Sequence, residues 1–241
     1  MLRRMLGLST MAFALALLFC TAASAGNEDV CKAKGSGAGG FAFGFNRVDL
    51  SELDAKLKGK GFEGLSNDNI FYGGAGYGVV RGKILLGGEG GGFSQDVSSD
   101  SLKASVDGGC GFFNVGYVVY SRGGLSVFPL LGIGGSTVEL RIVGREDAPS
   151  FDALLGNPRR EVNVSTAGLL FGIGVGADYL LVLGGDEEGK GGLLFGVRAG
   201  YTFSATEADW MMVDRDVLRG PDVRMTGPYV HLIFGGGGSA K

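Results

Sequence analysis

The segment at residues 191–205 alternates between two kinds of side chain, and this alternation constrains the fold more than any other feature. Alternate positions carry apolar residues, namely Leu193, Phe195, Val197, Ala199, Tyr201 and Phe203. The intervening positions are mainly small or polar, with Leu194 beside Gly196, Arg198, Gly200, Thr202 and Ser204. A two-residue period places the two sets on opposite faces of a β-strand. We therefore expect this strand to separate two different environments.

Residues 163–182 repeat the pattern, with glycine at Gly168, Gly172, Gly174 and Gly176 on the face opposite the large apolar residues. Glycine makes up 48 of the 241 residues, roughly three times its usual share. Because glycine is a poor helix former, this composition favours an all-β fold. A hydrophobic content of 45% argues against disorder, and a net charge of −3 gives no basic surface for nucleic acid.

Turn residues and polar clusters divide the chain into eight predicted strands. These strands span residues 37–49, 69–80, 84–96, 101–120, 125–143, 163–182, 191–205 and 226–236. The second, third, fourth and sixth connections are short, whereas the first, fifth and seventh are long. The rhythm predicts antiparallel neighbours, with short turns at one end of the sheet and long loops at the other.

Residues 1–25 are organised like a secretory signal peptide. Arg3 and Arg4 form a basic start, residues 6–19 are mostly apolar, and residues 23–25 supply small side chains for cleavage. After cleavage we expect three parts: a linker at 26–36, a β-domain at 37–236 and a flexible C-terminal tail at 237–241. The mature chain keeps Cys31 and Cys110, which either form a disulfide in an oxidising compartment or stay unpaired.

With a signal peptide, eight alternating segments and short turns opposite long loops, the chain resembles the small outer-membrane β-barrel proteins of Gram-negative bacteria. The resemblance implies an eight-stranded antiparallel up-and-down barrel at residues 37–236. It also implies a place in the outer membrane and contact with its lipid and its assembly machinery. Aromatic residues near the segment ends are candidates for interfacial belts: Phe45, Tyr77, Tyr120, Tyr179 and Phe203. A soluble periplasmic glycine-rich β protein is the alternative.

Several polar residues fall on the predicted inner faces of the strands. They are Glu89, Asn114, Glu139, Arg141, Asp178, Arg198 and His231. Because buried charges must be paired, we expect Arg198 and Arg141 to face the carboxylates in a lumen network. This network is either a structural plug of ion pairs or an ion-conducting path.

The sequence offers little for catalysis, metals or cofactors. His231 has Ile233 two residues away, so no local nucleophile accompanies the single histidine. No cysteine–histidine cluster predicts a metal site. A G-x-G-x-x-A pattern at residues 172–177 precedes a predicted strand, whereas nucleotide binding requires a helix there. We therefore predict no cofactor.

The last long loop contains an apolar triplet, Trp210, Met211 and Met212, in otherwise polar surroundings. Such a triplet either packs over the barrel mouth or contacts a partner. The sequence thus predicts a non-enzymatic outer-membrane barrel with a structural or surface-interaction role. A narrow pore, a small-ligand carrier and a membrane-surface enzyme remain alternatives, and the oligomeric state is open.

Overall fold

The computed structural model describes residues 35–145, 161–185, 189–206, 209–212 and 215–240, and these residues are nearly all in β-strands. The expected signal peptide, most of the linker and Cys31 lie outside the described residues. Eight long strands form the main sheet: β1 (Gly35–Arg47), β2 (Asp68–Val80), β3 (Ile84–Ser98), β4 (Leu102–Tyr117), β6 (Leu125–Gly144), β7 (Glu161–Gly185), β8 (Gly189–Ser204) and β11 (Gly227–Ala240).

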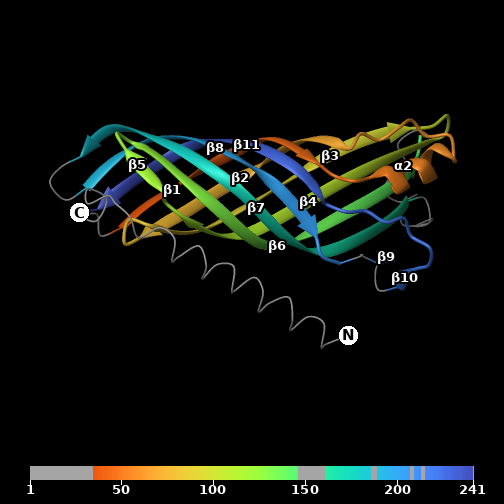
Figure 1. Ribbon diagram of the computed structural model, residues 1–241. Helices are drawn as coiled ribbons and strands as arrows, with labels where there is room; N and C mark the ends of the chain where they lie inside the picture. The colour runs from red at the N-terminus through yellow and green to blue at the C-terminus, as the bar shows by residue number, and fades with distance from the viewer. Residues whose placement is uncertain (1–34, 146–160, 186–188, 207–208, 213–214, 241) are drawn as a thin grey trace, which may run out of the picture. The chain divides into compact units, whose positions relative to one another are not determined.

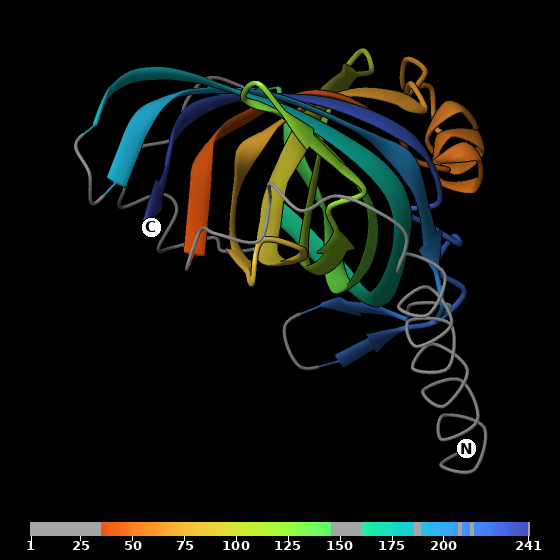
Figure 2. The same cartoon turned by 60° about the vertical axis from the view of Figure 1, so that its left-hand side comes forward.

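These strands close into a barrel. Each long strand pairs antiparallel with the next along the chain, and β11 pairs antiparallel with β1, with Phe41 opposite Phe234. Figure 2 shows β1 and β11 side by side where the sheet curls round on itself. The predicted eight-stranded antiparallel up-and-down barrel is confirmed. Closure leaves no free edge in the ring of long strands, as a lipid-facing sheet requires.

The turn end of the barrel contains tight connections. Between β2 and β3, Arg81 and Gly82 both have positive φ (52° and 66°), the geometry of a type I′ hairpin turn. Between β4 and β6 the short strand β5 (Tyr120–Arg122) forms a small hairpin with the start of β6. The strand that we predicted to continue to residue 120 therefore ends at Tyr117.

The loop end contains additional structure. Helix α2 (Ser51–Lys58) follows β1, and the short strands β9 (Trp210–Met212) and β10 (Arg215–Val217) form a hairpin between β8 and β11. Figure 1 shows α2, β9 and β10 at the end of the barrel opposite the C-terminus. Among the described residues, no helix is long and apolar enough to cross a membrane.

The end of the chain differs from our expectation. We predicted that strand pairing stops at residue 236, but β11 continues to Ala240 and stays paired with both β1 and β8. The glycines there allow close packing of neighbouring strands, since a Cβ at Gly238 would lie 2.9 Å from the carbonyl oxygen of Lys190. Residues 237–240 thus belong to the barrel, although their glycines suggested a flexible tail.

Large apolar side chains project outward from all eight long strands. Exposed examples are Phe43, Tyr72, Leu86, Phe113, Ile133, Ile173, Phe195 and Leu232. We call this outward surface the apolar belt. Water would hydrate these groups poorly, whereas the hydrocarbon of a bilayer would cover them without cost.

The barrel interior is filled by apolar side chains at three places. At the loop end, Leu53 and Leu57 of α2 pack with Trp210 and with inward residues of the strands. Two smaller groups lie in the barrel: one contains Ala42, Phe71, Leu194 and Ile233, and the other contains Leu85, Phe128 and Leu130. Leu85 is the second residue of β3 after the turn from β2, so this last group lies toward the turn end. The lumen is therefore packed along its length, as expected for a narrow eight-stranded barrel.

Candidate functional site

The buried ion pair of the lumen joins Arg198 of β8 to Asp178 of β7. The guanidinium contacts both carboxylate oxygens, Nη1 to Oδ1 at 2.5 Å and Nη2 to Oδ2 at 3.0 Å. Both side chains are almost completely buried, at 4% and 3% exposure. The Tyr77 hydroxyl also donates to Asp178, and the Arg198 guanidinium lies 4.6 Å from the centre of the Phe128 ring. A bidentate, fully enclosed pair of this kind fixes two neighbouring strands in register.

Inward glycines make room for this pair. A Cβ at Gly196 would lie 2.5 Å from the Asp178 carboxylate, and a Cβ at Gly176 would lie 2.3 Å from the Phe128 ring. Even a methyl group at either position would collide with the polar cluster or its aromatic cover. The glycine face that the sequence predicted in 163–182 and 191–205 thus has a specific role, because it leaves space for the bulky side chains of the lumen.

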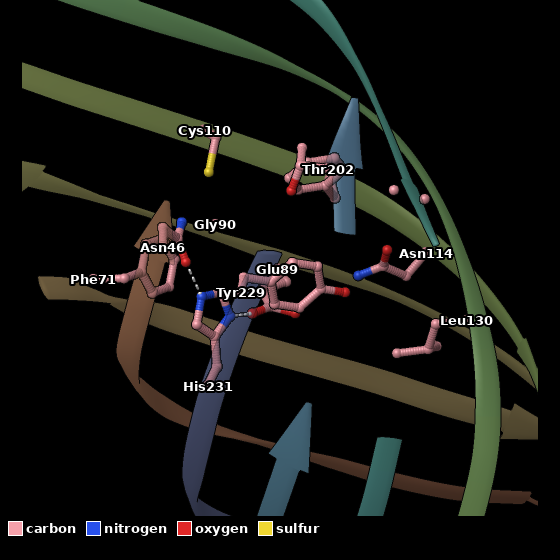
Figure 3. A pocket seen from close by; sticks show the side chains of 13 residues that line it. Asn46, Phe71, Glu89, Gly90, Cys110, Asn114, Leu130, Thr202, Tyr229 and His231 are labelled. Carbon is pink, nitrogen blue, oxygen red and sulfur yellow. Dashed lines mark hydrogen bonds and ion pairs between the residues drawn. The ribbon is translucent and has the colours of Figure 1, made fainter. Parts of the chain in front are cut away.

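A second polar cluster surrounds His231 of β11, the direct cross-strand neighbour of Arg198. Figure 3 shows the imidazole between Glu89 and Asn46: Nδ1 is hydrogen-bonded to Glu89, and Nε2 lies 2.5 Å from Oδ1 of Asn46. The Phe71 ring stacks on the imidazole at a centroid distance of 4.1 Å. His231 is 5% exposed, so the lumen holds it in one orientation with both ring nitrogens occupied.

A small cavity lies beside His231. Cys110, Asn114, Thr202 and Tyr229 contribute to its wall, as Figure 3 shows. The space open to water is about 20 Å³, which is enough for about one water molecule. The Cys110 thiol is free, and the disulfide that we considered involves Cys31, which lies outside the described residues. The cavity can hydrate the cluster, but it is too small for an organic ligand.

Each of the two clusters pairs an acidic side chain with a basic one. Arg198 lies against Asp178, and His231 lies against Glu89. Burial of a charge without a counter-charge would be costly, so this pairing allows four ionisable groups to occupy a narrow lumen.

The structure separates two residues from the predicted network. Glu139 and Arg141 of β6 lie on the outer wall near the loop end, where Arg141 Nε contacts Glu161 at 2.8 Å and Glu139 accepts from Asn163 at 2.6 Å. Their inward neighbours are Val138 and Leu140, which belong to the apolar group at the loop end. The prediction that they lie in the lumen was wrong, because it assumed polar residues inside along the whole strand.

Sequence reasoning also missed two members of the clusters. Tyr77 was a candidate for an interfacial belt, but it points inward and contacts Asp178. Asn46 was not considered, although it lies on the same face of β1 as the buried residue Ala42. The alternation of β1 and β2 contained both signals, since each residue is an even number of positions from a buried neighbour.

The apolar triplet of the last loop is divided. Trp210 is buried in the loop-end group, and its indole Nε1 donates to the carbonyl oxygen of Pro221 at 2.6 Å. Met211 and Met212 are each 43% exposed. One residue of the triplet therefore packs over the barrel mouth, and two are accessible.

Comparisons with known proteins give fold-level likeness alone. The sequence matches no protein-family model, and no curated protein matches it. The outer membrane protein OprG from Pseudomonas aeruginosa is similar over 87% of this chain and 97% of its own, with 14% identity and a TM-score of 0.41. The outer membrane protease OmpT from Escherichia coli is similar over 91% of this chain and 100% of its own, with 10% identity and a TM-score of 0.39. At these values neither protein carries an argument about activity.

Proposed function

We propose that this chain is an integral outer-membrane barrel without enzymatic activity that acts as a structural element or through its loop-end surface. The observation that carries the proposal is the apolar belt on all eight strands of a closed sheet. A soluble barrel would place these side chains inside and polar ones outside. In this proposal, membrane lipid contacts the belt, and the outer-membrane assembly machinery inserts the chain.

The packed lumen supports a closed barrel over a pore. A hydrated ion would have to displace α2, the aromatic side chains around His231 and the Arg198–Asp178 pair in turn. The same packing argues against catalysis. Both nitrogens of His231 are engaged by Glu89 and Asn46, so neither is available to a nucleophile or to a substrate.

The loop end supports a surface-interaction role. Met211 and Met212 are accessible on the β9–β10 hairpin, and Leu218 next to it is 88% exposed. Exposed apolar groups on an otherwise polar surface are typical of contact sites. A contact at this end leaves the membrane-spanning part of the barrel unchanged.

Fractionation of cells that express the full chain tests the membrane location. We expect the protein in the outer-membrane fraction, resistant to extraction with alkaline carbonate and released by detergent. Recovery in the periplasmic fraction without detergent would contradict the proposal. Single-channel recording of the purified protein in a planar bilayer tests the closed lumen, and discrete conductance steps would favour the pore instead.

A further inference from the structure

A groove on the outer wall at the loop end lies where β8, β11 and the start of α2 meet. The space open to water in it is about 520 Å³, which is within the range of small-molecule sites. Arg47, Arg224 and Asp49 line one part of it, and Tyr201 with Phe203 lines another. We call this feature the loop-end groove.

The groove lies on the boundary between the apolar belt and the polar loop end. Tyr201 and Phe203 are the last outward aromatic residues of β8, with ring centroids 4.8 Å apart, and Pro228 of β11 is the direct cross-strand neighbour of Tyr201. Arg47 is the last residue of β1, and Arg224 is joined to Asp49 by an isolated β-bridge. A ligand in the groove would therefore touch aromatic rings on one side and guanidinium groups on the other.

Both guanidinium groups are partly exposed. The Arg47 side chain is 57% exposed and lies 3.7 Å from Asp68, and that of Arg224 is 44% exposed and lies 3.2 Å from Asp222. Ion pairs as exposed as these are weak, so a better acceptor can replace the carboxylate. A phosphate group is such an acceptor, because its oxygens match the fork of a guanidinium.

Asp49 lies in the groove together with the two cations. Arg47 precedes it by two residues in the chain, and the backbones of Asp49 and Arg224 are hydrogen-bonded to each other. Hydrogen bonds from Ser51 lower the pKa of Asp49 most strongly, and the charges of Arg224 and Arg47 lower it further. The two guanidinium groups and this carboxylate therefore share one point of the groove. Ser51, Asn67 and Thr226 add polar side chains around that point, which suits a headgroup with hydroxyl groups.

We propose that the loop-end groove binds the phosphate-bearing headgroup of a membrane lipid, with the acyl chains running along Tyr201, Phe203 and Pro228. This inference rests on the proposed membrane location. Fractionation tests the location, whereas lipid binding in detergent micelles tests the groove directly. The failure of one can therefore be distinguished from the failure of the other.

The test uses native mass spectrometry of the purified full chain in non-ionic micelles, titrated with phosphatidic acid or with diacylglycerol of the same acyl chains. We expect phosphatidic acid to bind about tenfold more tightly than diacylglycerol, a free-energy difference of about 1.4 kcal/mol. The Arg47→Gln/Arg224→Gln variant should lose this preference. Equal binding of the two lipids to the unaltered protein would overturn the proposal.

A matched control removes two cations elsewhere on the outer wall. Lys103→Gln/Arg141→Gln changes the net charge by the same amount, and both residues form exposed ion pairs near the loop end outside the groove. We expect this variant to keep the preference for phosphatidic acid. Loss of the preference in this variant would show that it depends on overall charge and would overturn the proposal. A third titration uses inorganic phosphate. Displacement of the lipid by phosphate at comparable concentration would show a site for the free anion and would also overturn the proposal.

Discussion

The middle of the barrel and its loop end are built from the same strands with opposite arrangements of polar and apolar groups. In the middle, Ile133 of β6 faces outward, and the neighbouring Gly132 faces inward and lines the lumen cavity. At the loop end, Leu140 of β6 faces inward, and Arg141 faces outward. One strand thus reverses its pattern within a few residues.

The reversal is explained by a change in the solvent outside the barrel wall, from hydrocarbon around the middle to water around the loop end, as the proposed membrane location requires. In the proposed membrane location, hydrocarbon outside the middle would favour apolar side chains there and leave the inner face to glycine and paired charges. Water outside the loop end would favour charged residues there, so the inner face becomes an ordinary hydrophobic core covered by α2. The position of the reversal on each strand marks where we expect the strand to leave the membrane.

The largest expected effect comes from breaking the lumen pair. Asp178→Asn keeps the shape of the side chain but leaves the buried Arg198 without a counter-charge, which should lower the free energy of unfolding by about 3–5 kcal/mol. Asp96→Asn is the loop-end counterpart, because Asp96 pairs with Lys103 at 2.8 Å on the exposed outer wall. That change should cost less than about 1 kcal/mol. Urea unfolding in lipid vesicles measures both, and equal losses would contradict the difference between the regions.

A charge on the outer wall should distinguish membrane from water. Ile133→Arg places a cation in the apolar belt and should destabilise the inserted barrel by about 2–4 kcal/mol. Thr137→Arg changes the same face of β6 four residues closer to the loop end, where the cost should fall to about 0–1 kcal/mol. Unfolding free energies in vesicles compare the two variants. If Ile133→Arg were as stable as Thr137→Arg, the belt would not face lipid.

The smallest effect concerns glycine on the two faces of the wall. Gly196→Ala forces a methyl group against the Asp178 carboxylate, and overpacking of this kind costs about 1–3 kcal/mol. Gly111 faces outward, and a Cβ there would meet nothing within 4 Å. Gly111→Ala should therefore be neutral or slightly stabilising, since alanine restricts the unfolded chain. Thermal unfolding in micelles ranks the variants, and a larger loss for Gly111→Ala would reverse our assignment of the faces.

Local alternation was sufficient to predict the eight strands and most of the inward polar residues, whereas closure of the sheet into a ring was expected from the resemblance to outer-membrane barrels. Arg198, Asp178, Glu89 and His231 were all predicted on the inner face, and all four are in the lumen. The pattern failed for Glu139 and Arg141, because a strand's alternation gives two faces without saying which solvent each one meets. In the proposed membrane location, that assignment changes with depth in the bilayer, and depth is a property of the whole barrel.

The sequence by itself determined eight strands with two unlike faces and the positions of the short and long connections, because these features depend on residues close together in the chain. The tertiary structure decided which residues meet. His231 and Glu89 are 142 positions apart, and Tyr77 and Asp178 are 101 apart. Their contacts depend on the register of every strand between them and on the closure of β11 against β1. A long-range register is fixed by packing and hydrogen bonding across the entire sheet, so no local pattern contains it.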